Sequence, residues 1–140
     1  MLTPKKVKHR KWQVQRKSKL VPETRGTKIS FGSFGIRAIT VARVKSNQIE
    51  SARKAMTRKL TKAGKVWIRI FPDRPFTSKP AEVPMGSGKG DLDGYCFEVR
   101  PGRIIFEVDG VDETTAREAL RKAGTKLPVK TKILSREEAQ

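Results

Sequence analysis

Cysteine and histidine are nearly absent from this sequence of 140 residues, which contains one of each, Cys96 and His9. A single cysteine cannot form an intramolecular disulfide, so we expect a reducing compartment such as the cytosol. Cys96 falls in a predicted strand, where a buried, inert thiol is more common than a nucleophile. One histidine in a basic region supports neither a catalytic triad nor a histidine metal cluster. The composition therefore argues against an enzyme and predicts no metal or other cofactor.

Long apolar runs are also missing, although 36% of the residues are hydrophobic. No run approaches the roughly 18 residues that a membrane span needs. The N-terminal charges are not followed by the apolar stretch of a secretory signal, and no helix shows the large leucine or aromatic face of a membrane-surface helix. We therefore expect no membrane partner and one domain with a modest core.

Acidic residues are scarce in the first half of the chain. Residues 1–65 hold 19 lysines and arginines against two acids, Glu23 and Glu50, which gives a net charge of +17. Residues 66–140 hold 13 basic and 12 acidic residues, so their net charge is only +1. This asymmetry is typical of a basic nucleic-acid-binding region joined to an ordinary globular part.

Residues 1–26 predict an irregular basic arm, because their cations follow neither helical nor strand periodicity. A solvated tail is the usual interpretation of a charge run. Here the run is long, nearly free of acids and interleaved with Trp12, which can stack on a base, so phosphate binding is favoured. The expected RNA-contacting residues of the arm are Lys5, Lys6, Lys8, Arg10, Lys11, Trp12, Arg16, Lys17, Lys19 and Arg25.

The clearest helix is predicted over residues 46–63, with Ser46 as N-cap and Gly64 as terminator. Its apolar residues recur at steps of three and four and form one stripe: Ile49, Ala52, Met56, Leu60 and Ala63. The opposite side carries Lys54, Arg58 and Lys62. A merely solvated face would usually mix glutamate with lysine. After Glu50 this face has no acid, so RNA contact is favoured for its cations.

The remaining patterns predict an α+β fold: one mostly antiparallel sheet with two helices packed on it. A hairpin is expected over residues 27–44, with its turn at 32–35, and a strand over 65–71. A long Pro/Gly-rich loop is expected over 72–94. The later elements are strands at 95–100 and 103–108 joined by Pro101-Gly102, a helix at 113–123 capped by Asp112, and a strand at 129–134. The single domain thus spans residues 27–134, followed by a polar, frayed tail at 135–140.

Two further patterns bear on function. The loop Gly86-Ser87-Gly88-Lys89-Gly90 lacks the spacing of a phosphate-binding P-loop, and no helix is predicted after it. Insertion of this loop into RNA is favoured over a mobile linker. The aromatic residues show no RNP-like pattern. Trp12 is expected to be exposed, and most of the others are expected in the core: Trp67, Phe71, Phe76, Tyr95, Phe97 and Phe106.

Two motifs are specific in combination: Lys65-Val66-Trp67-Ile68-Arg69-Ile70-Phe71-Pro72 and Met85-Gly86-Ser87-Gly88-Lys89-Gly90. Shorter motifs occupy residues 1–8, 30–35, 48–58, 101–103, 116–120 and 126–132. In this order, over nearly the whole chain, they resemble the bacterial and organellar large-subunit ribosomal protein L-sixteen family.

The resemblance implies a compact α+β sandwich bound to large-subunit rRNA near the central protuberance, with the arm threaded into RNA. It also implies neighbouring ribosomal proteins and a position beside the A-site and P-site tRNAs. The loop of Met85, Gly86, Ser87, Gly88, Lys89 and Gly90 would reach toward the peptidyl-transferase region, where RNA performs the chemistry. Two residues depart from the family pattern: Pro84 stands where arginine is usual, and Ser87 where lysine is usual.

The leading hypothesis is a structural, rRNA-binding component of the large ribosomal subunit that supports subunit assembly and tRNA positioning. Its expected location is the cytoplasmic ribosome, with a plastid or mitochondrial ribosome as alternatives. The second hypothesis is a free nucleic-acid chaperone or DNA/RNA-binding protein that uses the same charge, although no base-reading recognition helix is identified. An enzyme ranks third.

Overall fold

The structure is a computed structural model that describes residues 1–14 and 20–139. In chain order, its elements are β1 (Phe34–Ala38), β2 (Ala42–Lys45), α1 (Ser46–Leu60), β3 (Lys65–Ile68), β4 (Arg74–Ser78), β5 (Asp91–Val99), β6 (Ile104–Asp109), α2 (Glu113–Gly124) and β7 (Thr131–Ser135). Among these helices, none is long and apolar enough to cross a membrane.

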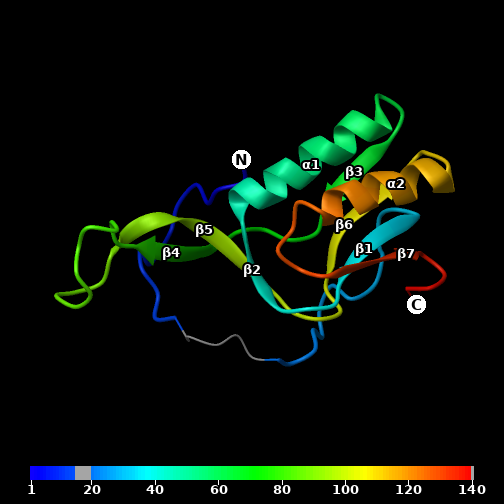
Figure 1. The fold of residues 1–140 in the computed structure, drawn as a ribbon. Coiled ribbons are helices and arrows are strands. Elements are labelled where there is room, and N and C mark those ends of the chain that lie inside the picture. The colour runs from blue at the N-terminus through cyan, green and yellow to red at the C-terminus, as the bar shows by residue number, and fades with distance from the viewer. Residues whose placement is uncertain (15–19, 140) are drawn as a thin grey trace.

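The strands form two antiparallel sheets, which confirms the predicted α+β class but divides the expected single sheet. The main sheet has the order β3-β6-β1-β7, and the smaller sheet has the order β2-β5-β4. Figure 1 shows α1 and α2 side by side on one face of the main sheet, while the smaller sheet extends away from it. The molecule therefore consists of a helix-covered sheet and a projecting β-unit.

The hairpin predicted over residues 27–44, with its turn at 32–35, is wrong, because residues 27–31 form no strand. The predicted second strand at 36–44 is divided between β1 and β2, which belong to different sheets. The turn at Pro101-Gly102 likewise leads from β5 in the smaller sheet to β6 in the main sheet. These two crossings are linked: the Ala38 N–H donates to the Arg103 carbonyl at 2.9 Å, and the Gly102 N–H donates to the Ala38 carbonyl at 2.8 Å. Each turn thus changes sheets instead of reversing the chain within one.

The loop predicted over residues 72–94 is also too long. β4 occupies Arg74–Ser78 and pairs with β5, which begins at Asp91, so the loop between these strands is reduced to residues 79–90. Pro75 is compatible with this strand because β4 lies at the edge of its sheet, where a missing N–H donor is tolerated. The Pro-rich sequence therefore belongs partly to a projecting β-hairpin.

The core lies between the two helices and the main sheet. The α1 residues Ile49, Ala52, Met56 and Leu60 are buried, as the helical spacing predicts. The α2 stripe is buried as well: Ala116, Ala119, Leu120 and Ala123. The first helix ends earlier than predicted, because Thr61 adopts a positive φ of 57°. Ala63 consequently falls outside the helix and is exposed.

A small second cluster covers the other face of the main sheet. Ile29, Ile104, Leu134 and Ala139 are all buried in it. Ala139 belongs to the tail that the sequence predicts to be frayed, and its burial shows that the tail folds back as far as this residue. The outer face of the sheet is thus covered by two short segments that precede β1 and follow β7.

Candidate RNA-binding surfaces

Residues 11 and 12 of the basic arm lie against the β4–β5 hairpin. Lys11 Nζ is 3.6 Å from the Asp91 carboxylate, and Lys89 Nζ donates to the Trp12 carbonyl. Other predicted RNA-contacting residues of the arm are exposed to solvent: Lys5, Lys6, Lys8, Arg10 and Arg25. Arg16, Lys17 and Lys19 lie outside the described residues. The two contacts with the hairpin position the first part of the arm, while most of its charge faces outward.

The tip of the β4–β5 hairpin is highly exposed. Met85 has 90% of its surface exposed, and Gly86, Ser87 and Gly88 have φ angles of 98°, 56° and 102°. Three successive positive φ angles turn the backbone sharply, and glycine adopts that conformation without a steric cost. Lys79 donates to the Gly86 carbonyl, which supports the turn from below. The tip therefore has a tightly turned backbone, in contrast to an extended linker.

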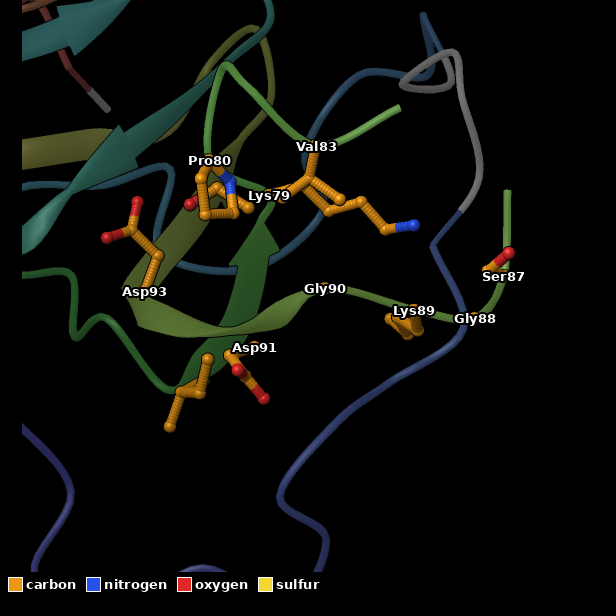
Figure 2. A pocket seen from close by; sticks show the side chains of 11 residues that line it. Lys79, Pro80, Val83, Ser87, Gly88, Lys89, Gly90, Asp91 and Asp93 are labelled. Carbon is orange, nitrogen blue, oxygen red and sulfur yellow. The ribbon is translucent and has the colours of Figure 1, made fainter. Parts of the chain in front are cut away.

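Figure 2 shows an open hollow at the base of this tip. Its charged lining residues are Lys79, Lys89, Asp91 and Asp93. Two cations and two carboxylates balance, so the hollow itself is a poor phosphate site. Gly90 leads into strand β5 instead of a helix N-terminus, in agreement with the prediction that this sequence is not a P-loop.

The outer side of α1 carries the three predicted cations, Lys54, Arg58 and Lys62, which together form a basic ridge. Lys54 and Arg58 are exposed on the helix, and Lys62 is exposed just beyond its end. Within the described residues, no carboxylate forms an ion pair with any of these three cations. An anion approaching this ridge therefore does not have to displace an internal partner.

The structure extends the ridge into a cleft between the C-terminal ends of α1 and α2. Its lining includes Arg58, Lys59, Lys122 and Lys126, together with Ala55 and Thr125. Glu118 is the carboxylate that meets these cations, 2.6 Å from Lys59 Nζ and 3.5 Å from Lys122 Nζ. The hydrogen bond from Lys59 is the main cause that lowers the pKa of Glu118. Four cations against one carboxylate leave the cleft positive, as an RNA phosphate requires.

Sequence reasoning missed the contribution of α2 to this cleft. Lys122 and Lys126 lie in the acid-balanced half of the chain, and their local sequence resembles an ordinary helix end. Only the packing of α1 against α2 brings them next to Arg58. The available signal was the pair of basic residues in the last turn of each helix.

A buried carboxylate organises the segment that precedes β1. Glu107 on β6 is fully buried and accepts hydrogen bonds from the N–H groups of Ser30, Phe31 and Gly32 at 3.1, 2.6 and 2.8 Å. It also pairs with the Arg69 guanidinium. Burial by itself would raise the pKa of Glu107, but the three N–H donors and Arg69 outweigh it and lower the pKa below 4.5.

The aromatic residues are less buried than the sequence predicts. Phe106 is fully buried, whereas 43% of Phe71 is exposed, and Trp67, Phe76, Tyr95 and Phe97 are half-buried. Trp12 is 41% exposed, as predicted, but Phe31 is more exposed, at 57%. Cys96 is a free, buried thiol whose pKa is raised mainly by burial. This finding agrees with the predicted inert role.

A small α+β domain with a basic arm and a cation-lined helical face defines a class of protein, the compact nucleic-acid-binding module. The family described as Ribosomal protein L16p/L10e matches residues 4–134. The chain belongs to this ribosomal protein family, as the resemblance of its motifs to the L-sixteen proteins indicated.

Curated relatives agree over nearly the whole chain. The large ribosomal subunit protein uL16 of Leifsonia xyli subsp. xyli is 56% identical over 138 residues, which cover 99% of this chain and 98% of the relative. The uL16 protein of Clavibacter michiganensis subsp. michiganensis is 55% identical with the same coverage. That of Halorhodospira halophila is 52% identical over 136 residues, covering 97% of this chain and 98% of the relative.

Proposed function

We propose that this ribosomal protein is a structural component of the large subunit that binds large-subunit rRNA through its arm and the basic α1–α2 surface. The observation that carries the proposal is the set of unpaired cations on α1, continuous with the positive cleft shared with α2. Each phosphate contact releases condensed counterions, so many modest contacts add up to tight binding. The role is to hold and position RNA, without catalysis by the protein.

The arm and the folded domain differ in how they hold their cations, and this difference supports the proposal. The outward cations of the arm can follow an RNA backbone, because the described part of the arm contains no helix or strand that fixes their spacing. The α1 ridge has a fixed spacing, because its helix is buried along the opposite stripe. The arm can therefore follow the RNA backbone along a variable path, whereas the ridge presents its cations to the RNA at a fixed spacing.

The experiment compares two lysine pairs of equal charge. Replacing Lys54 and Lys62 by alanine is expected to weaken binding to large-subunit rRNA and to reduce the salt slope by roughly one for each lost contact. The matched control replaces Lys130 and Lys132, which are also exposed but lie in the acid-balanced half. Equal losses in both variants would mean that total charge alone, and no defined surface, governs binding.

A finer part of the proposal concerns tRNA. We infer that the hairpin tip, with Met85, Gly86, Ser87, Gly88, Lys89 and Gly90, lies near the A-site tRNA and reaches toward the P-site tRNA. Its exposure and its projection from the domain support this position. Pro84 and Ser87 supply no charge, so Lys89 is the cation of the tip. Particles carrying Lys89→Ala should bind A-site tRNA more weakly than particles carrying Lys130→Ala, and equal tRNA affinities would contradict this position.

A free nucleic-acid chaperone is the second candidate, since the same charges could bind RNA transiently. Sedimentation of a cell lysate separates the two functions. A subunit component travels with the large particles and stays there after a moderate salt wash, whereas a chaperone remains near the top of the gradient. Recovery of the chain only in the slow fractions would contradict the structural role.

A further inference from the structure

Phe31 is an exposed aromatic residue outside the basic surfaces, and hydrogen bonds fix the backbone around it. We infer that Phe31 and Trp67 form a stacking platform for one unpaired RNA base, an inference that rests on the proposed function of RNA binding. This contact would add a base-dependent interaction to the phosphate contacts of the arm and the α1–α2 surface. Neither ring forms part of the basic arm, ridge or cleft described above.

The geometry places Phe31 over two side chains of the edge strand β3 and its continuation. The ring centroids of Phe31 and Trp67 are 6.2 Å apart with an interplanar angle of 15°, a stacked arrangement. The Arg69 guanidinium carbon is 5.1 Å from the Phe31 centroid. Residues two apart on an extended chain point to the same side, so Trp67 and Arg69 support the ring from below. The 57% exposed fraction of Phe31 then belongs to the side that faces solvent.

The platform is fixed before any ligand arrives. Glu107 accepts the N–H groups of Ser30, Phe31 and Gly32, so the backbone on both sides of the ring is held. A Cβ at Gly32 would lie 2.7 Å from the Val108 carbonyl oxygen, which shows how tightly this segment is pressed on β6. Arg69 is held by the same carboxylate and by the Lys28 carbonyl. A pre-ordered ring loses little conformational entropy when it stacks on a base.

Charge favours a nucleotide as the occupant. By the same alternation, Lys65 lies on the side of β3 that carries Trp67, and exposed Lys28 adjoins Arg69 just beyond the strand. Two carboxylates lie in this region: Glu107 is held by Arg69 and three N–H groups. Asp109 accepts a hydrogen bond from the Ser33 hydroxyl at 2.7 Å, which is the main cause of its lowered pKa, with a smaller contribution from the charge of Lys65. A flat ring bordered by cations complements a base joined to phosphates, the combination used by proteins that bind single strands. An apolar protein partner would gain little from these cations.

The test uses the full chain and two probes, a short oligoadenylate and an abasic oligonucleotide of the same length and charge. The wild-type chain should prefer the oligoadenylate. Phe31→Ala should weaken oligoadenylate binding by roughly 5- to 150-fold, the range for loss of one stacked base, and should leave abasic binding unchanged. The salt slope should also stay the same, because phenylalanine neutralises no phosphate.

Two further variants separate stacking from folding. Phe31→Leu keeps apolar bulk over Trp67 but lacks a π face, so it should bind as weakly as Phe31→Ala, whereas Phe31→Tyr should retain most of the affinity.

Tryptophan fluorescence gives an independent measurement of the same contact. In a Trp12→Phe background, Trp67 is the remaining tryptophan, and its fluorescence should change with oligoadenylate but not with the abasic probe.

The outcomes distinguish this inference from the proposed function. Equal binding of both probes by wild type and Phe31→Ala would overturn the platform and leave RNA binding through phosphates intact. Failure of the wild-type chain to bind either probe or large-subunit rRNA at low salt would overturn both. Loss of large-particle association in Phe31→Ala with unchanged probe binding would assign the ring to a neighbouring protein, and would also overturn the platform.

Discussion

Glu107 is buried beside Arg69, and its surroundings determine how this charge affects stability. A carboxylate moved from water into a protein interior loses several kcal/mol of hydration. Here three N–H groups and a guanidinium replace that hydration. The same contacts tie residues 30–32 to β6, so one side chain links charge neutralisation to the position of Phe31.

Glu107→Gln should lower the free energy of unfolding by about 3–5 kcal/mol, because it leaves Arg69 without its buried partner. The pH dependence follows from the lowered pKa of Glu107. Its carboxylate stabilises the folded state above pH 4.5, the unfolded value, and this contribution is lost as the pH falls through the lower folded-state pKa. Urea titrations across this acid range should therefore show a shallower pH dependence in the variant than in the wild-type chain.

A matched control is Glu137→Gln, which removes an exposed carboxylate. Its free energy of unfolding should stay within about 0.5 kcal/mol of wild type. If Glu107→Gln behaved like this control, the interpretation of Glu107 as a buried anchor would be wrong.

Cys96 gives a second prediction for a single residue. Its thiol is 2% exposed, and burial raises its pKa. A thiolate-specific reagent should therefore react with the folded chain at neutral pH far more slowly than with the chain in denaturant. Comparable rates in the two conditions would show that β5 opens readily or that the thiol is accessible.

These residue-scale features differ in how far the sequence could reveal them. The burial of Cys96 follows from its place in a strand. The role of Glu107 could not be predicted, because its three N–H donors lie 75 to 77 residues earlier in the chain and Arg69 lies 38 residues earlier. The exposure of Phe31 depends on the same long-range contact. Local patterns contain no information about such pairs.

At the scale of elements, the helices follow directly from local periodicity. The α1 stripe repeats every three or four residues and is buried as predicted. The pairing of strands cannot be predicted in the same way. A turn motif indicates that the chain changes direction, but it does not indicate which sheet the next strand joins. Pro101-Gly102 and residues 39–41 both connect strands of different sheets. The continuous strand predicted over residues 36–44 and the single sheet predicted around Pro101-Gly102 are both wrong for this reason. The turn predicted at 32–35 is wrong for another reason, because residues 27–31 form no strand.

Met56 tests the packing of α1 on the main sheet. Met56→Ala should lower the free energy of unfolding by about 2–5 kcal/mol, because the fully buried side chain leaves a cavity in the core. Ser51→Ala, on an exposed position of the same helix, should change stability by less than about 0.5 kcal/mol. Chemical denaturation of both variants gives the comparison, and a loss below about 1 kcal/mol for Met56→Ala would contradict the assigned core.

At the scale of the whole molecule, the charge asymmetry was visible in the sequence, but its arrangement was not. The arm and the α1 ridge could be predicted from residues 1–65 alone. The cleft could not, since Lys122 and Lys126 join Arg58 only after α2 packs against α1. The acid-balanced half therefore supports the basic surface and also contributes part of it.

The most direct test of the account is the affinity of the full chain for large-subunit rRNA as a function of salt. If six or more phosphates are contacted, the binding constant should fall by roughly 10³ or more between about 50 and 200 mM salt. The Lys54 and Lys62 double variant should show a smaller slope than the Lys130 and Lys132 control. A nearly flat salt response, or no binding to this RNA at low ionic strength, would contradict the account.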